Sequence, residues 1–242
     1  DPTWIHWIGN TVWVLPAWDD DEKVSVSLSW ERLPKTWTVA NSLGAGSLKQ
    51  RIATEFGNLR SAVYVAGDFR LNKTTVAGDP LFVAVRGEWQ FTDGALTEEI
   101  RRVIEAERGF WNDHSQDFYL VTLVPTNEGP NALSFGGTGL HDSFALFATP
   151  NASIPRLRTV LAHEYAHNWI PTRLGKFPDP EQSMYWFSEG FTEYYTYQLL
   201  FRSGLITKDE LIGNYNSLIP EYYLSPVRTA SNQRIVSDFW NV

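Results

Sequence analysis

Apolar and polar positions alternate with a period of two in the first part of the chain. The clearest case is Val24 to Trp30, where Val, Leu and Trp take turns with Ser at every position. Successive side chains of a β-strand point to opposite faces, so this pattern predicts a strand with one buried face. Shorter segments rich in Val and aromatic residues are further strand candidates: 11–15, 61–66 and 81–86. We therefore expect residues 1 to about 92 to form a sandwich or a curved sheet.

Helical spacing, with apolar residues three and four positions apart, begins near Thr97. This residue precedes two glutamates, as at a helix start, and Gly109 is a natural stop. Ser153 and Pro155 predict the start of a second helix, which Pro171 ends. Two more helices are predicted, at 182–202 and, from the capping box that begins at Thr207, to about 218.

Two segments between the first and second predicted helices have other patterns. Residues 118–124 are apolar over a length typical of a buried strand. Residues 134–147 begin with several glycines and indicate a loop that leads into a strand. Together the patterns predict an α+β protein with a β-rich N-terminal domain at 1–94 and a mostly helical domain at 95–242.

Composition and charge narrow the class of protein. The 242 residues are 43% hydrophobic and 20% charged, which is ordinary for a globular chain. Twenty Lys and Arg against 28 Asp and Glu give a formal charge of -8, and no basic run interrupts this balance, so we expect no nucleic-acid partner. No apolar run approaches the roughly 18 to 20 residues that cross a bilayer, so we expect no transmembrane segment.

The ends of the chain and its lack of cysteine bear on where the protein works. The sequence begins Asp-Pro-Thr-Trp, which is neither an initiator Met nor a signal peptide. We therefore expect a processed or excised chain. The absence of cysteine excludes disulfides and thiol catalysis but leaves the compartment open. We favour an extracytoplasmic location, periplasmic or secreted.

The candidate chemistry lies in the second predicted helix, in the sequence His-Glu-Tyr-Ala-His at 163–167. On a helix, His163 and His167 are one turn apart, about 6 Å along the axis and about 40° around it. Both imidazoles then project from one face, which suits two ligands of a zinc ion. Glu164 falls about 100° from His163, where it can reach a water on that metal and act as a base.

Two glutamates on the next predicted helix complete this arrangement. Glu189 follows His167 by 22 positions, and two antiparallel helices joined by a turn would bring it to the histidines as a third ligand, with one position open for water. Glu193 lies one turn further, where it either orients a ligand histidine or is a surface charge; we favour the first. The alternative for the whole set is a pair of ordinary, partly buried histidines beside an acidic helix.

The motif His-Glu-x-x-His followed by Trp-x-x-Glu-Gly-x-x-x-Tyr-Tyr resembles that of the gluzincin zinc peptidases. Residues 163–169 and 186–192 are most similar to the glycyl aminopeptidase family, relatives of aminopeptidase N and thermolysin, and the strong match covers about 40 residues. The resemblance implies a thermolysin-like catalytic domain and a peptide or protein substrate. It also implies one zinc ion held by His163, His167 and Glu189, with Glu164 as the general base.

The chain departs from these relatives in two places. The relatives carry a glutamate after a glycine or glycine pair, and this glutamate binds the free amino terminus of the substrate. Here Gly136 and Gly137 are followed by no acidic residue until Asp142, which comes directly after His141. These four residues are our candidates for substrate binding, and the choice between exopeptidase and endopeptidase action stays open. The relatives also have an oxyanion-stabilising tyrosine well downstream, for which Tyr222 and Tyr223 are the candidates. The family spacing extends past residue 242, so we expect a truncated catalytic domain.

Three functions compete at this point. The leading prediction is an enzyme, a zinc metallopeptidase in which Glu164 activates water. One alternative is a catalytically incomplete fragment that binds peptides and retains zinc. The other is a carbohydrate-binding β domain with an incidental metal site, built on the tryptophans crowded into the first 40 residues, which we otherwise interpret as an aromatic core: Trp4, Trp7, Trp13, Trp18, Trp30 and Trp37.

Overall fold

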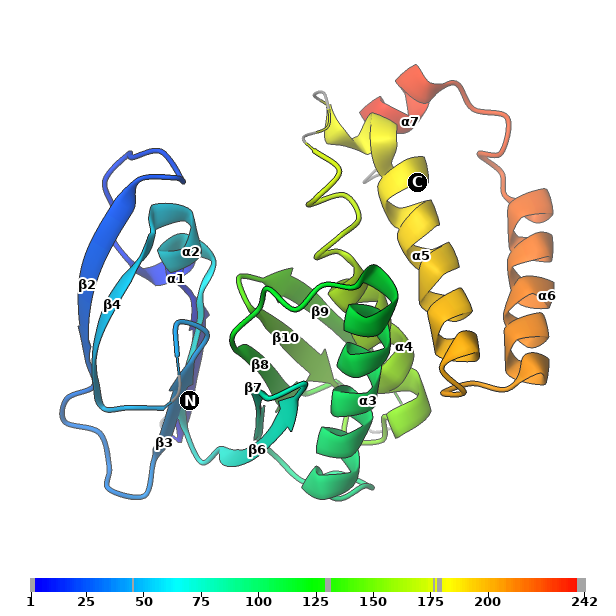
Figure 1. Cartoon of the computed structure of the whole chain (residues 1–242). Helices are drawn as coiled ribbons and strands as arrows, with labels where there is room; N and C mark the ends of the chain where they lie inside the picture. The colour runs from blue at the N-terminus through cyan, green and yellow to red at the C-terminus, as the bar shows by residue number, and fades with distance from the viewer. Residues whose placement is uncertain (1–2, 45, 129–131, 176, 178–179, 239–242) are drawn as a thin grey trace.

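The computed structural model describes residues 3–44, 46–128, 132–175, 177 and 180–238. Over this part of the chain, sheets come first and long helices follow, which confirms the predicted α+β class (Figure 1). None of the described helices combines the length and the apolar character needed to span a membrane.

The N-terminal strands form two small antiparallel sheets. Three strands pair in the order β1-β5-β3, and β2 pairs separately with β4. The predicted strands at 24–30 and 61–66 are confirmed. The elements are β1 (Trp4–Ile8), α1 (Gly9–Val12), β2 (Lys23–Ser29), β3 (Thr38–Asn41), β4 (Lys49–Glu55), α2 (Phe56–Ser61) and β5 (Val63–Gly67).

The strand predicted at 11–15 is wrong. This segment enters the short helix α1 and then continues without a strand partner. The Thr11 hydroxyl donates a hydrogen bond to the Ile8 carbonyl at 2.7 Å, a local bond that competes with strand pairing. Gly9 is packed against the α2 backbone so closely that an added Cβ would lie 2.2 Å from the Leu59 carbonyl oxygen. The contact with α2 therefore turns the chain here.

A third, larger sheet of five strands has the order β6-β7-β8-β10-β9. Its three inner strands are parallel, and its two outer strands are antiparallel to their neighbours. The strands are β6 (Arg70–Val76), β7 (Asp79–Val85), β8 (Tyr119–Pro125), β9 (Phe135–Leu140) and β10 (Ser143–Ala148), which confirms the predicted strands at 81–86 and 118–124. The sheet joins strands from both sides of the predicted boundary at 94–95. The division into two domains stays a prediction, and the change from one sheet to the next falls between β5 and β6.

The inner strands of the large, five-stranded sheet are buried on both faces, which explains their continuous apolar sequence. Val121 of β8 packs with residues of the helical layer such as Leu161. The next residue back, Leu120, packs on the opposite face with Val65 of β5. The large sheet thus lies between the small three-stranded sheet and the helices, as Figure 1 shows.

Helices α3 and α4 pack against each other beside the large sheet, α5 packs against α4, and α6 packs against α5 (Figure 1). The helices predicted from Ser153, at 182–202 and from Thr207 are present, but the first ends at Ala166 instead of Pro171 and the second begins at Tyr185 after a 3-10 turn. The capping box of Thr207 and Glu210 is present, and the last of these helices continues through Pro220. The elements are α3 (Asp93–Trp111), α4 (Ile154–Ala166), the 3-10 helix η1 (Glu181–Met184), α5 (Tyr185–Arg202), α6 (Lys208–Leu224) and α7 (Asn232–Asp238).

Helix α3 begins earlier and ends later than predicted. Its N-cap is Thr92, whose hydroxyl accepts a hydrogen bond from the Ala95 amide at 3.2 Å. The hydroxyl of Thr97 donates instead to the Asp93 carbonyl inside the helix. The helix passes Gly109 and ends at Asn112, which takes the left-handed conformation with a φ of 49°.

The glycine-rich segment predicted as a loop is the strand β9, which pairs with β10 along its length. One of its glycines is required by packing: a Cβ on Gly137 would lie 2.2 Å from the tip of the Phe144 ring. β9 is the last strand of the sheet and lies beside α4, so its outer edge faces the helix that carries the histidine motif.

Candidate metal centre and cleft

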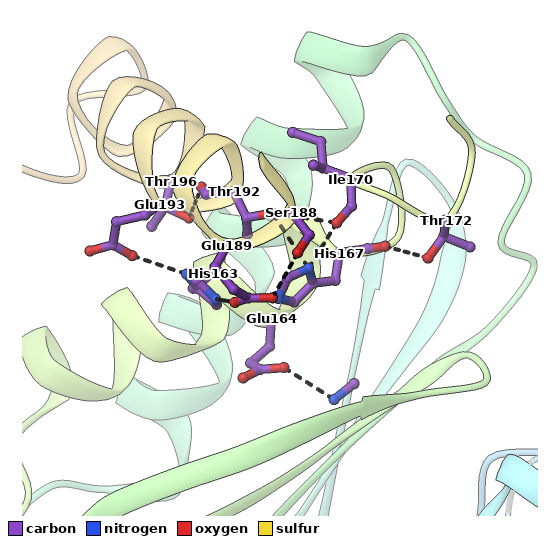
Figure 2. A network of polar contacts seen from close by, with 11 residues as sticks. His163, Glu164, His167, Ile170, Thr172, Ser188, Glu189, Thr192, Glu193 and Thr196 are labelled. Atoms are coloured by element: carbon purple, nitrogen blue, oxygen red, sulfur yellow. Dashed lines mark hydrogen bonds and ion pairs between the residues drawn. The ribbon is translucent and has the colours of Figure 1, made fainter. Parts of the chain in front are cut away.

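Helix α4 presents His163 and His167 on one face, as their spacing predicts. Their ring centroids are 4.9 Å apart, and Glu189 of α5 points between them (Figure 2). The Oε2 atom of Glu189 lies 3.2 Å from Nε2 of His163 and 3.6 Å from Nε2 of His167. One possible ligand atom from each residue lies within 4.8 Å of the other two, so the three side chains form a group that could hold a metal ion.

The spacing of these atoms fits zinc. A tetrahedral zinc ion with bonds of about 2.0 to 2.2 Å needs ligand atoms about 3.4 Å apart. The two distances from the Glu189 carboxylate lie on either side of this value. Three protein ligands also leave the fourth position free for a water or a substrate.

The second nitrogen of each histidine is held by an acceptor. Nδ1 of His163 lies 3.0 Å from Oε2 of Glu193, and Nδ1 of His167 lies 2.8 Å from the carbonyl oxygen of Ile170 (Figure 2). An acceptor at Nδ1 favours the tautomer with the proton on that nitrogen, which leaves the Nε2 lone pair for a metal. Glu193 therefore lies beside His163, at the position where a residue that orients this histidine is expected.

The charges of the group attract cations. Hydrogen bonds from His163 and then from His167 hold the pKa of Glu189 well below its usual range. Burial lowers the pKa of His163, but the bonds to Glu189 and Glu193 outweigh burial and raise this pKa to about 9. Without a metal, the proton on His163 thus offsets part of the negative charge of the carboxylates, and a divalent ion would replace this proton.

Glu164 points away from the three-residue group, toward β9. Its Oε2 accepts a hydrogen bond from the Gly139 amide at 3.2 Å (Figure 2). Partial burial raises the pKa of Glu164, and the positive histidines oppose this shift. The carboxylate is thereby fixed between the helix and the edge of the sheet, beside the metal group but outside it.

Two cavities meet at Glu164. One, of about 540 Å³, is lined by Gly136 and Gly137 on β9 and by His163. The other, of about 780 Å³, is lined by His141, Asp142, His167 and Glu189, among other residues. All four residues predicted to bind substrate therefore line a cleft that passes the metal group on both sides.

Asp142 is engaged by its neighbours within this cleft. Its two carboxylate oxygens lie 3.4 Å from the Gln116 side-chain amide and 3.2 Å from Nε2 of His141. Its φ of 44° places it in the left-handed region, at the turn between β9 and β10. Burial raises its pKa, and His141 acts in the opposite direction.

The structure does not bring Tyr222 and Tyr223 to the site. Both are on α6 and more than half exposed, and the guanidinium of Arg228 lies over their rings. Neither lines one of the two cavities, and α5 lies between their helix and α4 (Figure 1).

Two residues that the sequence reasoning missed line the smaller cavity, Arg156 and Tyr197. Arg156 precedes His163 by two helical turns, and Tyr197 follows Glu193 by one turn. The helical spacing that connected the two histidines would have identified both, because residues separated by whole turns share a face of their helix.

Comparison with known protein families agrees with the motif. A family model described as M61 glycyl aminopeptidase matches residues 156–238, which include the three residues of the metal group. The resemblance to glycyl aminopeptidases is thus confirmed over this segment. Among curated proteins, none matches the chain.

Solved structures resemble the fold at low sequence identity. An aminopeptidase N family protein from Idiomarina loihiensis aligns with a TM-score of 0.71 and 17% identity, over 87% of this chain and 39% of that one. An M1 zinc metallopeptidase from Deinococcus radiodurans aligns with a TM-score of 0.49. A mutant two-domain M1 zinc metallopeptidase bound to L-arginine aligns with a TM-score of 0.50. Each of these two metallopeptidases is 14% identical to this chain, and the alignments cover 81% of this chain and 44% of the other chain. The first comparison shows a shared fold, and the chain spans less than half the length of these structures.

Proposed function

We propose that this chain is part of a zinc metallopeptidase, an aminopeptidase-like gluzincin, in which His163, His167 and Glu189 hold one zinc ion. The observation that carries the proposal is the spacing of the three ligand atoms together with the acceptors on the far nitrogens of both histidines. The family model that matches residues 156–238 and the shared fold support it. We further propose that residues 95–242 are a thermolysin-like catalytic domain and that the protein works outside the cytoplasm.

In the proposed reaction Glu164 moves the proton. Zinc at this site would polarise the peptide carbonyl and make a water molecule acidic near neutral pH. Because Oε2 of Glu164 accepts a hydrogen bond from the Gly139 amide, we assign to Oε1 the role of taking the proton from that water. The same carboxyl group then returns it to the nitrogen of the leaving amine. Partial burial disfavours the charged form of Glu164, which makes it a stronger proton acceptor.

The substrate would lie along the edge of β9. Backbone groups on the outer edge of a terminal strand can pair with an extended peptide, and β9 lies beside Glu164 at Gly139. The cavities on either side of Glu164 accommodate peptide on both sides of the cleaved bond. Gly136 and Gly137 would contact it in one cavity, and His141 and Asp142 in the other.

A second candidate function is supported by the position of the tyrosines. Tyr222 and Tyr223 lie away from both cavities, so neither is placed to stabilise an oxyanion. On this alternative the chain binds zinc and peptide without cleaving the peptide. The carbohydrate-binding alternative is not favoured, because the indole of Trp7 stacks on Tyr64 and also contacts Trp13 and Trp30, which is how aromatic residues pack in a core.

Metal analysis coupled to a peptide digest tests the proposal. Wild-type protein should contain one zinc per chain and cleave a mixed peptide library, with cleavage positions read by mass spectrometry. Glu164→Gln should keep the zinc and slow hydrolysis by roughly 10²- to 10⁴-fold. Glu189→Gln serves as the matched control, because the same change at a ligand should also lose zinc. Zinc binding and peptide binding without cleavage would favour the second candidate, and full activity of Glu164→Gln would remove the mechanism.

A further inference from the structure

Two polar residues that the proposed reaction does not use also line the smaller cavity of the cleft. These are Arg156 on α4 and Tyr197 on α5. Phe135, Val160 and His163 of the metal group line the same cavity. The cavity wall therefore includes a cation and a hydroxyl-bearing residue besides a residue of the metal group.

Helix geometry places Arg156 and Tyr197 at similar distances from the metal group. The C-terminal end of α4 meets the N-terminal end of α5 at the metal group, where His163 and Glu189 are 3.2 Å apart. Arg156 precedes His163 by seven residues, about 10 Å along α4, and Tyr197 follows Glu189 by eight, about 12 Å along α5. Both therefore lie about 10 Å from the metal group, on the same side of it.

Arg156 has no counterion in the part of the chain that the structure describes. No hydrogen bond or ion pair of its guanidinium is found there, and the same holds for the Tyr197 hydroxyl. The carboxylates that line this cavity are engaged, Glu193 by His163 and Glu164 by Gly139. In a chain with a net charge of -8, an unpaired cation in the cleft is suited to an anion from outside.

The larger cavity has no unpaired arginine or lysine among the described residues that line it. Its one arginine, Arg173, is paired with Asp113 at 2.9 Å. Asp142 and Glu181 also line it. A peptide has a positive amino terminus and a negative carboxyl terminus, so this asymmetry favours one orientation in the cleft, with the carboxyl-terminal side toward Arg156.

We infer that Arg156, assisted by the Tyr197 hydroxyl, binds a carboxylate of the peptide on the carboxyl-terminal side of the cleaved bond. This rests on the proposed function only for the position of the bond that is cleaved. An extended peptide rises about 3.3 Å per residue, so a distance of about 10 Å corresponds to roughly three residues beyond the cleaved bond. The carboxylate is the chain terminus of a short peptide or an acidic side chain at this distance. Burial and the Glu193 carboxylate raise the pKa of Tyr197 to about 12, so its hydroxyl remains a donor at neutral pH.

Binding to the zinc-loaded Glu164→Gln protein, which keeps the cleft but lacks the base, separates recognition from hydrolysis. Alanine peptides of three to six residues are titrated as free acids and as C-terminal amides, with affinity measured by NMR. A second arm uses amidated pentapeptides with Glu or Gln at the third or fourth position. In one of the arms the carboxylate form should bind roughly five- to tenfold more tightly, as expected for one partly solvated ion pair. The arm that shows this preference identifies the source of the carboxylate.

Arg156→Gln, made in the same background, should abolish the preference and leave the affinity for uncharged peptides within about twofold. Arg51→Gln on the exposed strand β4 is the control, because it removes the same charge away from the cleft and should keep the preference. The inference is overturned if neither arm shows a preference, if no peptide binds, or if the preference survives in Arg156→Gln. Carboxylate-selective binding in a wild-type protein that cleaves nothing would remove the proposed function and keep the inference. If the carboxylate and uncharged forms of the peptides bind equally and the wild-type protein cleaves both, the inference is removed and the proposed function is kept.

Discussion

A half-buried histidine between the three-stranded and the five-stranded sheet should make the protein less stable as the pH falls from 7 to 5. His6 of β1 points toward the large sheet, where its Nε2 lies 3.4 Å from the Thr122 hydroxyl and its ring meets the Phe147 ring edge-on at 5.1 Å. Burial lowers the pKa of His6 from 6.5 to about 4, and a backbone hydrogen bond opposes part of this shift. Neither of the two neighbours titrates, so the environment of the ring is constant over this range.

The sign and size of the effect follow from proton linkage. Between pH 6.5 and about 4 the unfolded chain protonates His6 and the folded chain does not, so the unfolded state binds more protons. The contribution to the free energy of unfolding is therefore complete above pH 6.5 and is lost as the pH falls toward 4. At about 1.4 kcal/mol per pKa unit, the full loss is about 3 kcal/mol, of which about 2 kcal/mol falls between pH 7 and pH 5.

Urea unfolding of wild type and His6→Gln at pH 7 and pH 5 measures this contribution. The glutamine amide can replace the hydrogen bond to Thr122 but does not titrate, and all other groups titrate equally in the two proteins. Wild type should lose about 2 kcal/mol more than the variant between the two pH values. Both proteins are measured with excess EDTA, so that metal binding does not contribute. Equal losses in the two proteins would refute the assignment of a lowered pKa to His6.

Two further predictions concern the site and the strand beside it. Glu193→Gln should weaken zinc affinity roughly 10- to 100-fold, measured by competition with a chelator, because the carboxylate holds Nδ1 of His163; an unchanged affinity would make Glu193 a surface charge. Gly137→Ala should lower the free energy of unfolding by about 1 to 3 kcal/mol, because the new Cβ meets the Phe144 ring at 2.2 Å. Gly136→Ala, where nothing lies within 4 Å, is the matched control and should change stability little, and equal effects of the two would contradict the packing role of Gly137.

The metal group was predictable because its geometry is local. One helical turn determines the relation of His163 to His167, and a short helical hairpin brings Glu189 to them. The geometry of the larger cavity is not local, since this cavity combines β9, α4 and segments far apart in the sequence. No spacing rule connects these segments, so the sequence predicted the residues of the metal group but not the surfaces around them.

The errors have a common cause, which is that tertiary contacts decide what a residue does. Gly137 was assigned to a loop because glycine favours turns, whereas its role depends on the Phe144 ring in the neighbouring strand. Thr97 was predicted to cap the helix because glutamates follow it, but Thr92 makes the cap and Thr97 lies inside the helix. Tyr222 and Tyr223 were chosen for residue type alone, and their helix packs on the far side of α5.

The direction in which the histidines point is determined by the two unspecified residues of the motif, Tyr165 and Ala166. Tyr165 and Ala166 are fully buried, and the Tyr165 hydroxyl accepts a hydrogen bond from Nε of Arg108 at 2.9 Å and donates one to Gln116 at 2.6 Å. These contacts prevent α4 from rotating about its axis, because rotation would expose a large side chain and break both bonds. The face that carries His163, Glu164 and His167 must then be turned toward the cleft. The unspecified positions of the motif therefore anchor the helix, and the specified positions carry the side chains of the candidate site.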